Sequence, residues 1–289
     1  MDYRNYILEG NLIELDKLVQ NGWDMNLSNA DELGYTPLIE AIGNRNGSME
    51  VIQYLVEHGA NLEKGDSREG TPLLHACIAA DSEVLNYLIS KGANVNCLDD
   101  EGLSPLHYIC RYAFEWDSQS IIPLINAVNG ETKNSSIDDY LQIVKILLEN
   151  HAVLNVQSHN GLTPIHMAAS HNGEIFIPLL VEAGADVNIA NANQYTPLHS
   201  AADTGNAKAT RDLLNLGANV NAKDVYGFTP LIGAVLSGNR TVVNWLKSYG
   251  ADRTVQVLSA YNIVAVGDTA LDVARKMSRQ DLVDALLDI

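Results

Sequence analysis

The chain has 289 residues, of which 46% are hydrophobic, so it is long enough to bury the core of one large domain or two ordinary ones. Its 18 Lys and Arg and 36 Asp and Glu leave a net charge of −18, which repels phosphate backbones and argues against a nucleic-acid partner. No run approaches the about 18 consecutive apolar residues that a membrane-spanning helix requires, so we expect no membrane contact. The charge is typical of a soluble protein and favours a basic partner.

The N-terminus and the cysteines bear on the compartment. The opening stretch MDYRNYILEG has neither a long apolar segment nor a small-residue cleavage site, so no signal peptide is expected. The three cysteines, Cys77, Cys97 and Cys110, are odd in number and do not suggest a disulfide framework. A reducing, cytoplasmic location is therefore the expectation.

One short phrase recurs along the chain. Residues 1–30 come first and contain an apolar helical segment that ends at Gly22. Thr-Pro-Leu or a close variant then begins at Thr36, Thr71, Ser104, Thr163, Thr196, Thr229 and Thr269. The intervals are 35, 33, 59, 33, 33 and 40 residues. A second marker, a glycine after an apolar segment, keeps the same register at Gly22, Gly59, Gly92, Gly184, Gly217 and Gly250, with His151 in the equivalent position between Gly92 and Gly184. Two markers with a period near 33 indicate a repeat architecture.

Each copy predicts two helices followed by an extended finger. Thr or Ser is a good N-cap, and proline at the first helical position has its φ preset. The second helix carries apolar residues three to four apart, as in Val84, Leu85 and Leu88. Glycine then ends that helix in a left-handed conformation, and a turn of the type Asp224–Gly227 leads into the next copy. Gln194 replaces the finger glycine of its copy, so a different type of turn is possible there.

The motifs Gly-Ala-Asp/Asn-Val-Asn, Asp-x-x-Gly-x-Thr-Pro-Leu and Thr196–His199 (TPLH) together resemble the ankyrin repeat over nearly the whole chain. The resemblance implies an all-α solenoid with short β-hairpin fingers and about eight repeats, caps included. It implies a single domain over 1–289, with an N-terminal cap at 1–30 and a C-terminal cap at 267–289. One such unit cannot bury its own apolar face, so stability comes from stacking on neighbours.

Two insertions depart from this pattern. The 59-residue interval is about 26 residues too long, and the extra chain at 113–138 is apolar in its first half and polar in its second. It is either a local embellishment or a docking element, because long ordered insertions are often functional. The finger at 253–266 is about seven residues too long and predicts an extended β-hairpin. That hairpin either shields the last helix pair or contacts a partner.

The sequence offers no candidate catalytic residue, cofactor site or metal site. Nucleotide-binding glycine loops, nucleophile elbows and zinc motifs are all missing. The resemblance implies a structural, hydrogen-bonding role for His107, His166 and His199, which share one position of the repeat. Cys77 and Cys110 share a small-residue position and are expected to be buried and inert. We therefore expect no enzyme.

The resemblance implies a protein-binding module whose partner docks on the fingers and first helices. The residue before Thr-Pro-Leu is large and apolar in five of the first six copies, and such a stripe is typical of an interface. Other free positions lie at finger tips, on first helices and in the insertion. The candidate partner-binding residues are Tyr35, Arg68, Leu103, Arg111, Tyr112, Trp116, Leu162, His171, Tyr195, Tyr226 and Phe228.

Several roles remain open for such a module. It is either a monomeric adaptor or scaffold, or an inhibitor such as a bacterial toxin-neutralising immunity protein, for which the charge makes a basic target reasonable. A secreted bacterial ankyrin effector is a further alternative.

Overall fold

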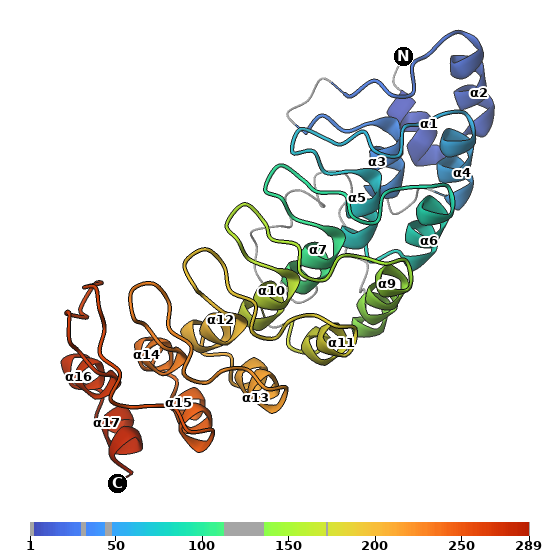
Figure 1. Ribbon diagram of the computed structural model, residues 1–289. Coiled ribbons are helices and arrows are strands. Elements are labelled where there is room, and N and C mark those ends of the chain that lie inside the picture. The colour runs from blue at the N-terminus through green and yellow to red at the C-terminus, as the bar shows by residue number, and fades with distance from the viewer. Residues whose placement is uncertain (1–2, 30–32, 44–47, 113–135, 172, 289) are drawn as a thin grey trace. The chain divides into compact units, whose positions relative to one another are not determined.

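The computed structural model describes residues 3–29, 33–43, 48–112, 136–171 and 173–288 (Figure 1). It contains 16 helices in that part of the chain, and strands are absent there apart from one isolated antiparallel bridge between Tyr261 and Val264. Two compact units are present, Met1–Val153 and Leu154–Ile289.

The N-terminal unit is built from consecutive pairs of short helices. They are α1 (Tyr3–Glu9), α2 (Leu12–Gln20), α3 (Pro37–Gly43), α4 (Met49–Glu57), α5 (Pro72–Ile78), α6 (Ser82–Ser90), α7 (Pro105–Tyr112) and α9 (Ile137–Glu149). First helices pack in a row, with α3 between α1 and α5, and α5 against α7. The unit therefore has the stacked helix pairs that the repeat period predicts.

The C-terminal unit has the same construction. Its helices are α10 (Pro164–Ser170), α11 (Phe176–Glu182), α12 (Pro197–Asp203), α13 (Ala207–Asn215), α14 (Pro230–Leu236), α15 (Arg240–Ser248), α16 (Ala270–Lys276) and α17 (Gln280–Leu287). Figure 1 shows α10, α12, α14 and α16 in one row and α11, α13, α15 and α17 in another, and the packing contacts agree. The core lies between the rows, where Phe176, Leu198 and Val243 are buried.

The helices begin and end where the sequence predicts. Thr71 caps α5 by accepting a hydrogen bond from the Leu74 N–H, and the proline that follows is the first helical residue. All six expected helix-stopping glycines have positive φ, and His151 adopts the same conformation at φ 62°. Pro178 lies in the first turn of α11, which has seven residues where most second helices have nine.

Four of the described fingers share one turn, built on the side chain of Asp66, Asp99, Asn191 or Asp224. The finger at 158–161 has Ser158 in that position, and its hydroxyl makes no such bond. Asp224 Oδ1 accepts from the backbone N–H groups of Tyr226 and Phe228 at 2.9 and 2.8 Å. The Gly227 N–H donates to the Asp224 carbonyl at 3.0 Å. Gln194 takes the same turn at φ 60°, with its N–H on the Asn191 carbonyl at 2.9 Å, so replacing glycine does not change the turn.

Hydrogen bonds also join successive repeats. Asn188 Oδ1 accepts from the Asn219 N–H at 2.7 Å, and Asn221 Oδ1 accepts from the Asp252 N–H at 2.7 Å. Asn188 and Asn221 both follow the valine of the repeated motif, so this part of the motif supplies the hydrogen bonds between neighbouring repeats.

The finger at 253–266 is less regular than an extended hairpin. The Val257 N–H donates to the Asp268 carbonyl and the Gly267 N–H to the Val257 carbonyl, which closes its base. The bridge between Tyr261 and Val264 closes its tip. Val257 and Val264 are buried and hold the finger on its own repeat.

Candidate partner-binding surface

Two buried histidines, His166 and His199, tie the next finger to their own repeat. His199 Nδ1 accepts from the Thr196 backbone N–H at 3.1 Å, and its Nε2 donates to the Phe228 carbonyl at 3.2 Å. His166 makes the equivalent bond to the Tyr195 carbonyl at 3.1 Å. Burial lowers the pKa of His199, although the Phe228 carbonyl opposes the shift. These side chains are structural, and they fix the backbone of the positions expected to face a partner.

The five apolar residues at the position before Thr-Pro-Leu differ in exposure. Leu103 is only 2% exposed, so it belongs to the core and cannot form part of a binding surface. Tyr35, Leu162, Tyr195 and Phe228 are half-buried. The Tyr35 ring meets the ring of His75 edge-on at 5.2 Å. The stripe is therefore only partly accessible to a partner.

The remaining candidates with described side chains lie nearer to solvent. Arg68 and Tyr226 are exposed at finger tips. Arg111 lies 3.5 Å from the Glu101 carboxylate, which joins a first helix to the finger before it. His171 ends α10, where its Nδ1 lies 2.7 Å from the Ser170 hydroxyl. Arg68 and Tyr226 are the two of these that are exposed.

The insertion falls largely outside the described residues. Tyr112 is the last residue of α7, and Trp116 lies in the stretch 113–135, which is not described. Of the expected insertion, only residues 136–138 are described. Ser136 forms a capping box with Asp139, and α9 begins at Ile137. The docking role of the insertion stays a prediction.

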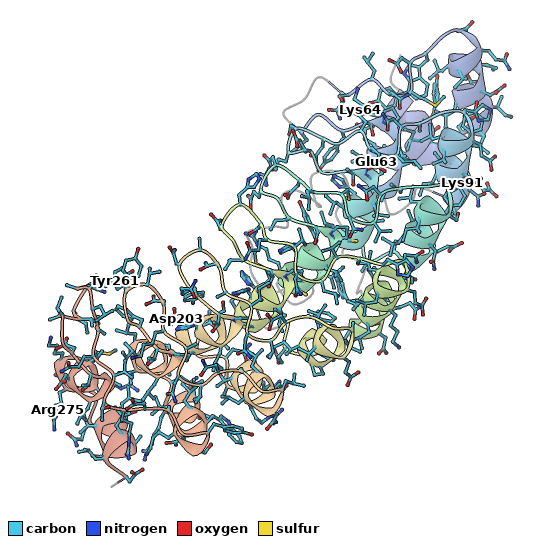
Figure 2. The ribbon with its side chains drawn as sticks, in the orientation of Figure 1. Glu63, Lys64, Lys91, Asp203, Tyr261 and Arg275 are labelled. Atoms are coloured by element: carbon cyan, nitrogen blue, oxygen red, sulfur yellow. The ribbon has the colours of Figure 1, made fainter. Side chains whose placement is uncertain are left out.

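In the C-terminal unit, the structure brings together residues of two successive fingers. The Phe228 and Tyr261 rings meet edge-on with centroids 6.3 Å apart. The Leu258 N–H donates to the Tyr226 carbonyl at 2.8 Å. Figure 2 shows Tyr261 at the tip of the last finger, where its side chain is 68% exposed. The candidate set from the sequence did not include Leu258 and Tyr261, although the apolar alternation of 253–266 was the signal that could have found them.

Asp203 gives this surface a carboxylate. It ends α12, and its Oδ2 accepts from the Tyr195 hydroxyl at 2.7 Å. Its Oδ1 occupies the place of the side chain that Gly233 of α14 lacks, since a Cβ on that glycine would lie 1.9 Å away. The side chain remains open to solvent on one side. Desolvation by the surrounding protein nevertheless raises the pKa of Asp203, and the negative charge of Asp224 raises it further. The hydrogen bond from Tyr195 acts in the opposite direction.

The three thiols, those of Cys77, Cys97 and Cys110, are buried and unbridged. Burial raises the pKa of Cys97 to about 11 and raises the pKa of Cys77 and Cys110 as well, so these thiols are inert at neutral pH. Across the described residues, no three His, Cys, Asp or Glu side chains are grouped as metal ligands would be.

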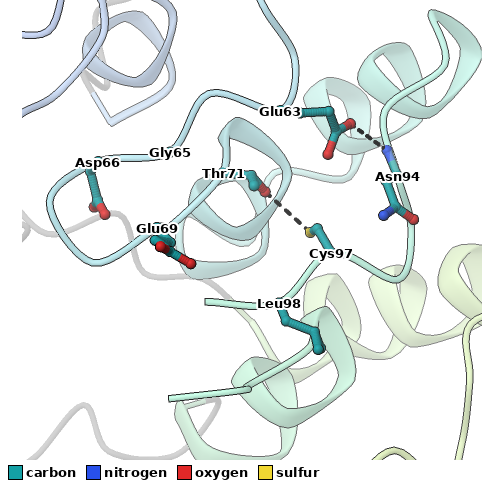
Figure 3. Close-up of a pocket in the computed structure, with 8 residues that line it drawn as sticks. All are labelled: Glu63, Gly65, Asp66, Glu69, Thr71, Asn94, Cys97 and Leu98. Carbon is teal, nitrogen blue, oxygen red and sulfur yellow. Dashed lines mark hydrogen bonds between the residues drawn. The ribbon is translucent and has the colours of Figure 1, made fainter. Parts of the chain in front are cut away.

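One open pocket of about 340 Å³ lies in the N-terminal unit (Figure 3). Its lining residues are Glu63, Gly65, Asp66, Glu69, Thr71, Asn94, Cys97 and Leu98. The Glu63 carboxylate accepts from the Asn94 N–H at 2.7 Å, and Thr71 Oγ1 lies 3.1 Å from Cys97 Sγ. Burial alone would raise the pKa of Asp66, but its contact with His75 and two backbone N–H groups outweigh this and lower it. Most polar groups of the pocket thus already serve the repeat structure.

Among the described residues, no helix has both the length and the apolar character to cross a bilayer.

The comparisons with known proteins identify the repeats. A family model described as ankyrin repeats (3 copies) matches residues 7–99 and 135–224. The chain is 36% identical over 70 residues to "Arf-GAP with coiled-coil, ANK repeat and PH domain-containing protein 2" of Rattus norvegicus and of Mus musculus, and 34% identical to that of Homo sapiens. Each match covers 24% of this chain and 9% of the relative, so the chain spans only a small part of the length of these proteins.

The family match covers more than half of the chain, and the helix pairs, capped fingers and inter-repeat histidines agree with it. Ankyrin repeats are protein-interaction modules. The chain belongs to the ankyrin-repeat family.

Proposed function

We propose that this protein is a non-catalytic adaptor or scaffold that binds a partner protein on its fingers and first helices. The rigid fingers are the observation that carries the proposal. In the fingers of Tyr195 and Phe228, the turn is fixed by an Asn or Asp side chain and by the histidine of the preceding repeat. A surface that is already ordered loses little conformational entropy on binding.

The distribution of charge supports a basic partner. The N-terminal unit, 1–153, has nine Lys and Arg against 24 Asp and Glu, a net charge of −15. The C-terminal unit, 154–289, has nine against 12, a net charge of −3. Acidity confined to one part of a chain raises the association rate with basic surfaces and makes that rate dependent on salt.

The same charge favours a second function, inhibition of a basic protein. An acidic ankyrin module can cover a basic active site, as an immunity protein covers a toxin. The two roles differ in outcome, because an inhibitor abolishes the partner's activity and an adaptor leaves it intact.

The organisation that goes with this function is one ankyrin-repeat domain over 1–289, acting as a monomer in the cytoplasm. Its caps are 1–30 and 267–289, with the insertion at 113–138 and the longer finger at 253–266. Three buried, unbridged cysteines are compatible with a reducing compartment.

Affinity capture at two salt concentrations tests the proposal. The tagged full chain is incubated with lysate of its source cells at about 0.15 M and about 0.5 M salt, and the captured proteins are identified by mass spectrometry. We expect to capture a protein at the lower salt concentration and less of it at the higher one. After purification, that protein should bind the chain through a basic face. Capture of no protein beyond that of a tag-only control would refute the function. A purified partner that binds equally at both concentrations would refute the electrostatic part alone.

A further inference from the structure

Exposed apolar side chains are concentrated on two successive fingers of the C-terminal unit. They are Val225, Tyr226, Leu258, Tyr261, Ile263 and Val266, and they are between 44% and 68% exposed. Single exposed apolar residues are ordinary, whereas a contiguous group on one surface indicates a binding site. Four of the six belong to the longer last finger, which is a departure from the repeat pattern rather than part of it.

This apolar surface is held in place by the fold. The Leu258 N–H bonds to the Tyr226 carbonyl, and Tyr261 packs edge-on against Phe228. Val257 and Val264, each 1% exposed, anchor the finger beneath them. The exposed side chains are therefore presented on a fixed backbone, as the anchor residues of an interface are.

A line of contacts connects this surface to Asp203. The Phe228 carbonyl accepts from His199, and the His199 ring stacks on Tyr195 with centroids 5.1 Å apart. The Tyr195 hydroxyl then donates to the Asp203 carboxylate. The acidic group and the apolar fingers are thus joined by direct contacts within one unit.

The charges around Asp203 favour an incoming cation. Within the described residues, neither Asp203 nor Asp224 forms a salt bridge. Other carboxylates of this unit have partners, since Asp268 pairs with Lys276 at 2.5 Å and Asp288 with Arg253 at 2.7 Å. Burial and the neighbouring Asp224 both raise the pKa of Asp203, which means that its ionised form is short of compensating positive charge.

We propose that Tyr226, Leu258 and Tyr261, together with the carboxylate of Asp203, bind an extended segment of a partner protein that carries an apolar side chain and a Lys or Arg. The apolar residue packs on the two fingers, and the cation pairs with Asp203. This inference rests on the proposed function and assigns the chemistry of the partner to one surface of the C-terminal unit.

Selection from random peptides tests the assignment without knowledge of the natural partner. The probe is a displayed library of peptides of about twelve residues, which extend over about 40 Å. The full chain is the target, and each selected peptide is synthesised and its Kd measured by fluorescence polarisation. The variants are Tyr261→Ser and Leu258→Ser on the finger and the isosteric Asp203→Asn on α12.

Two control variants are matched in chemistry and lie away from this surface. Glu182→Gln removes one negative charge from an exposed position of α11, and Leu287→Ala removes an exposed apolar side chain from the end of α17. Far-UV circular dichroism and thermal melts establish that all five variants fold as the parent does.

The assignment predicts peptides that share an apolar residue and a Lys or Arg. Each finger substitution weakens them about tenfold or more, whereas the controls change Kd less than about twofold. In Asp203→Asn, the advantage of the basic peptide over its Lys→Gln or Arg→Gln analogue disappears. Peptides that bind all variants alike would overturn the assignment and leave the module function standing. A library that yields no binder would count against both.

Discussion

Gly233→Ala should destabilise the protein, although alanine is normally the better helix residue. In an isolated helix interior this change gains about 1 kcal/mol. Here the new Cβ would lie 1.9 Å from Asp203 Oδ1, so the carboxylate must move away from the Tyr195 hydroxyl. Overpacking of this kind costs about 1–3 kcal/mol. Taking about 2 kcal/mol for the clash, the net effect is a loss of about 1 kcal/mol.

The Asp203→Ala background reverses the sign of this effect. Without the carboxylate there is no clash, so Gly233→Ala should then stabilise the chain by about 1 kcal/mol. The coupling between the two substitutions is therefore about 2 kcal/mol. It is measured by urea unfolding of the four proteins, followed by circular dichroism, with the m-value checked for constancy. A coupling below about 0.5 kcal/mol, the usual limit of additivity, would refute the position assigned to Asp203.

Four further predictions concern the scaffold. His199→Leu leaves the buried Thr196 N–H without its partner and removes one of the two hydrogen bonds to the Phe228 carbonyl, which still accepts from the Asp224 N–H, so urea unfolding should give a loss of about 1–3 kcal/mol; a loss below about 0.5 kcal/mol would contradict the bridging role. Because the folded state lowers the pKa of His199, the unfolded chain binds more protons below about pH 6.5, and the free energy of unfolding should fall as pH decreases from 7 towards 5, less so in His199→Gln. Gln194→Gly should stabilise the chain by about 0.5–1 kcal/mol, since it relieves a left-handed conformation, and an unchanged urea midpoint would show that no strain exists there. All three thiols should resist Ellman's reagent at pH 8 and react when the chain unfolds in urea; rapid reaction of the native protein would contradict their burial.

The helices of the repeats could be predicted because their signals are local. Thr71, followed by proline, caps the start of α5, and Gly92 follows the C-cap of α6 in a left-handed conformation. The sequence alone does not decide the type of turn at Gln194. The turn keeps the common geometry because Asn191 supplies the same bonds as Asp224 does. A residue can therefore replace glycine when the bonds around it determine the turn.

The surface was harder to predict, because it depends on neighbours some 30 residues away. Leu103 and Phe228 share one position in the repeat, yet only Leu103 is buried in the core. Asp203 owes its position to Gly233 in the next repeat, and no periodic pattern marks that pair. The apolar alternation of 253–266 indicated a hairpin but not which of its side chains face solvent, and these include Leu258 and Tyr261.

Site-specific photo-crosslinking tests the central claim, that the fingers of this ankyrin-repeat protein bind a partner protein. A photoreactive phenylalanine analogue replaces Tyr226 at a finger tip in one protein and Glu182 on an outer helix in another, both exposed positions of the same unit. Irradiation in lysate of the source cells, followed by mass spectrometry, should give a covalent adduct with one protein from position 226 and none from position 182. Adducts from position 182 alone, or none at either position under conditions where the partner is captured, would contradict the claim.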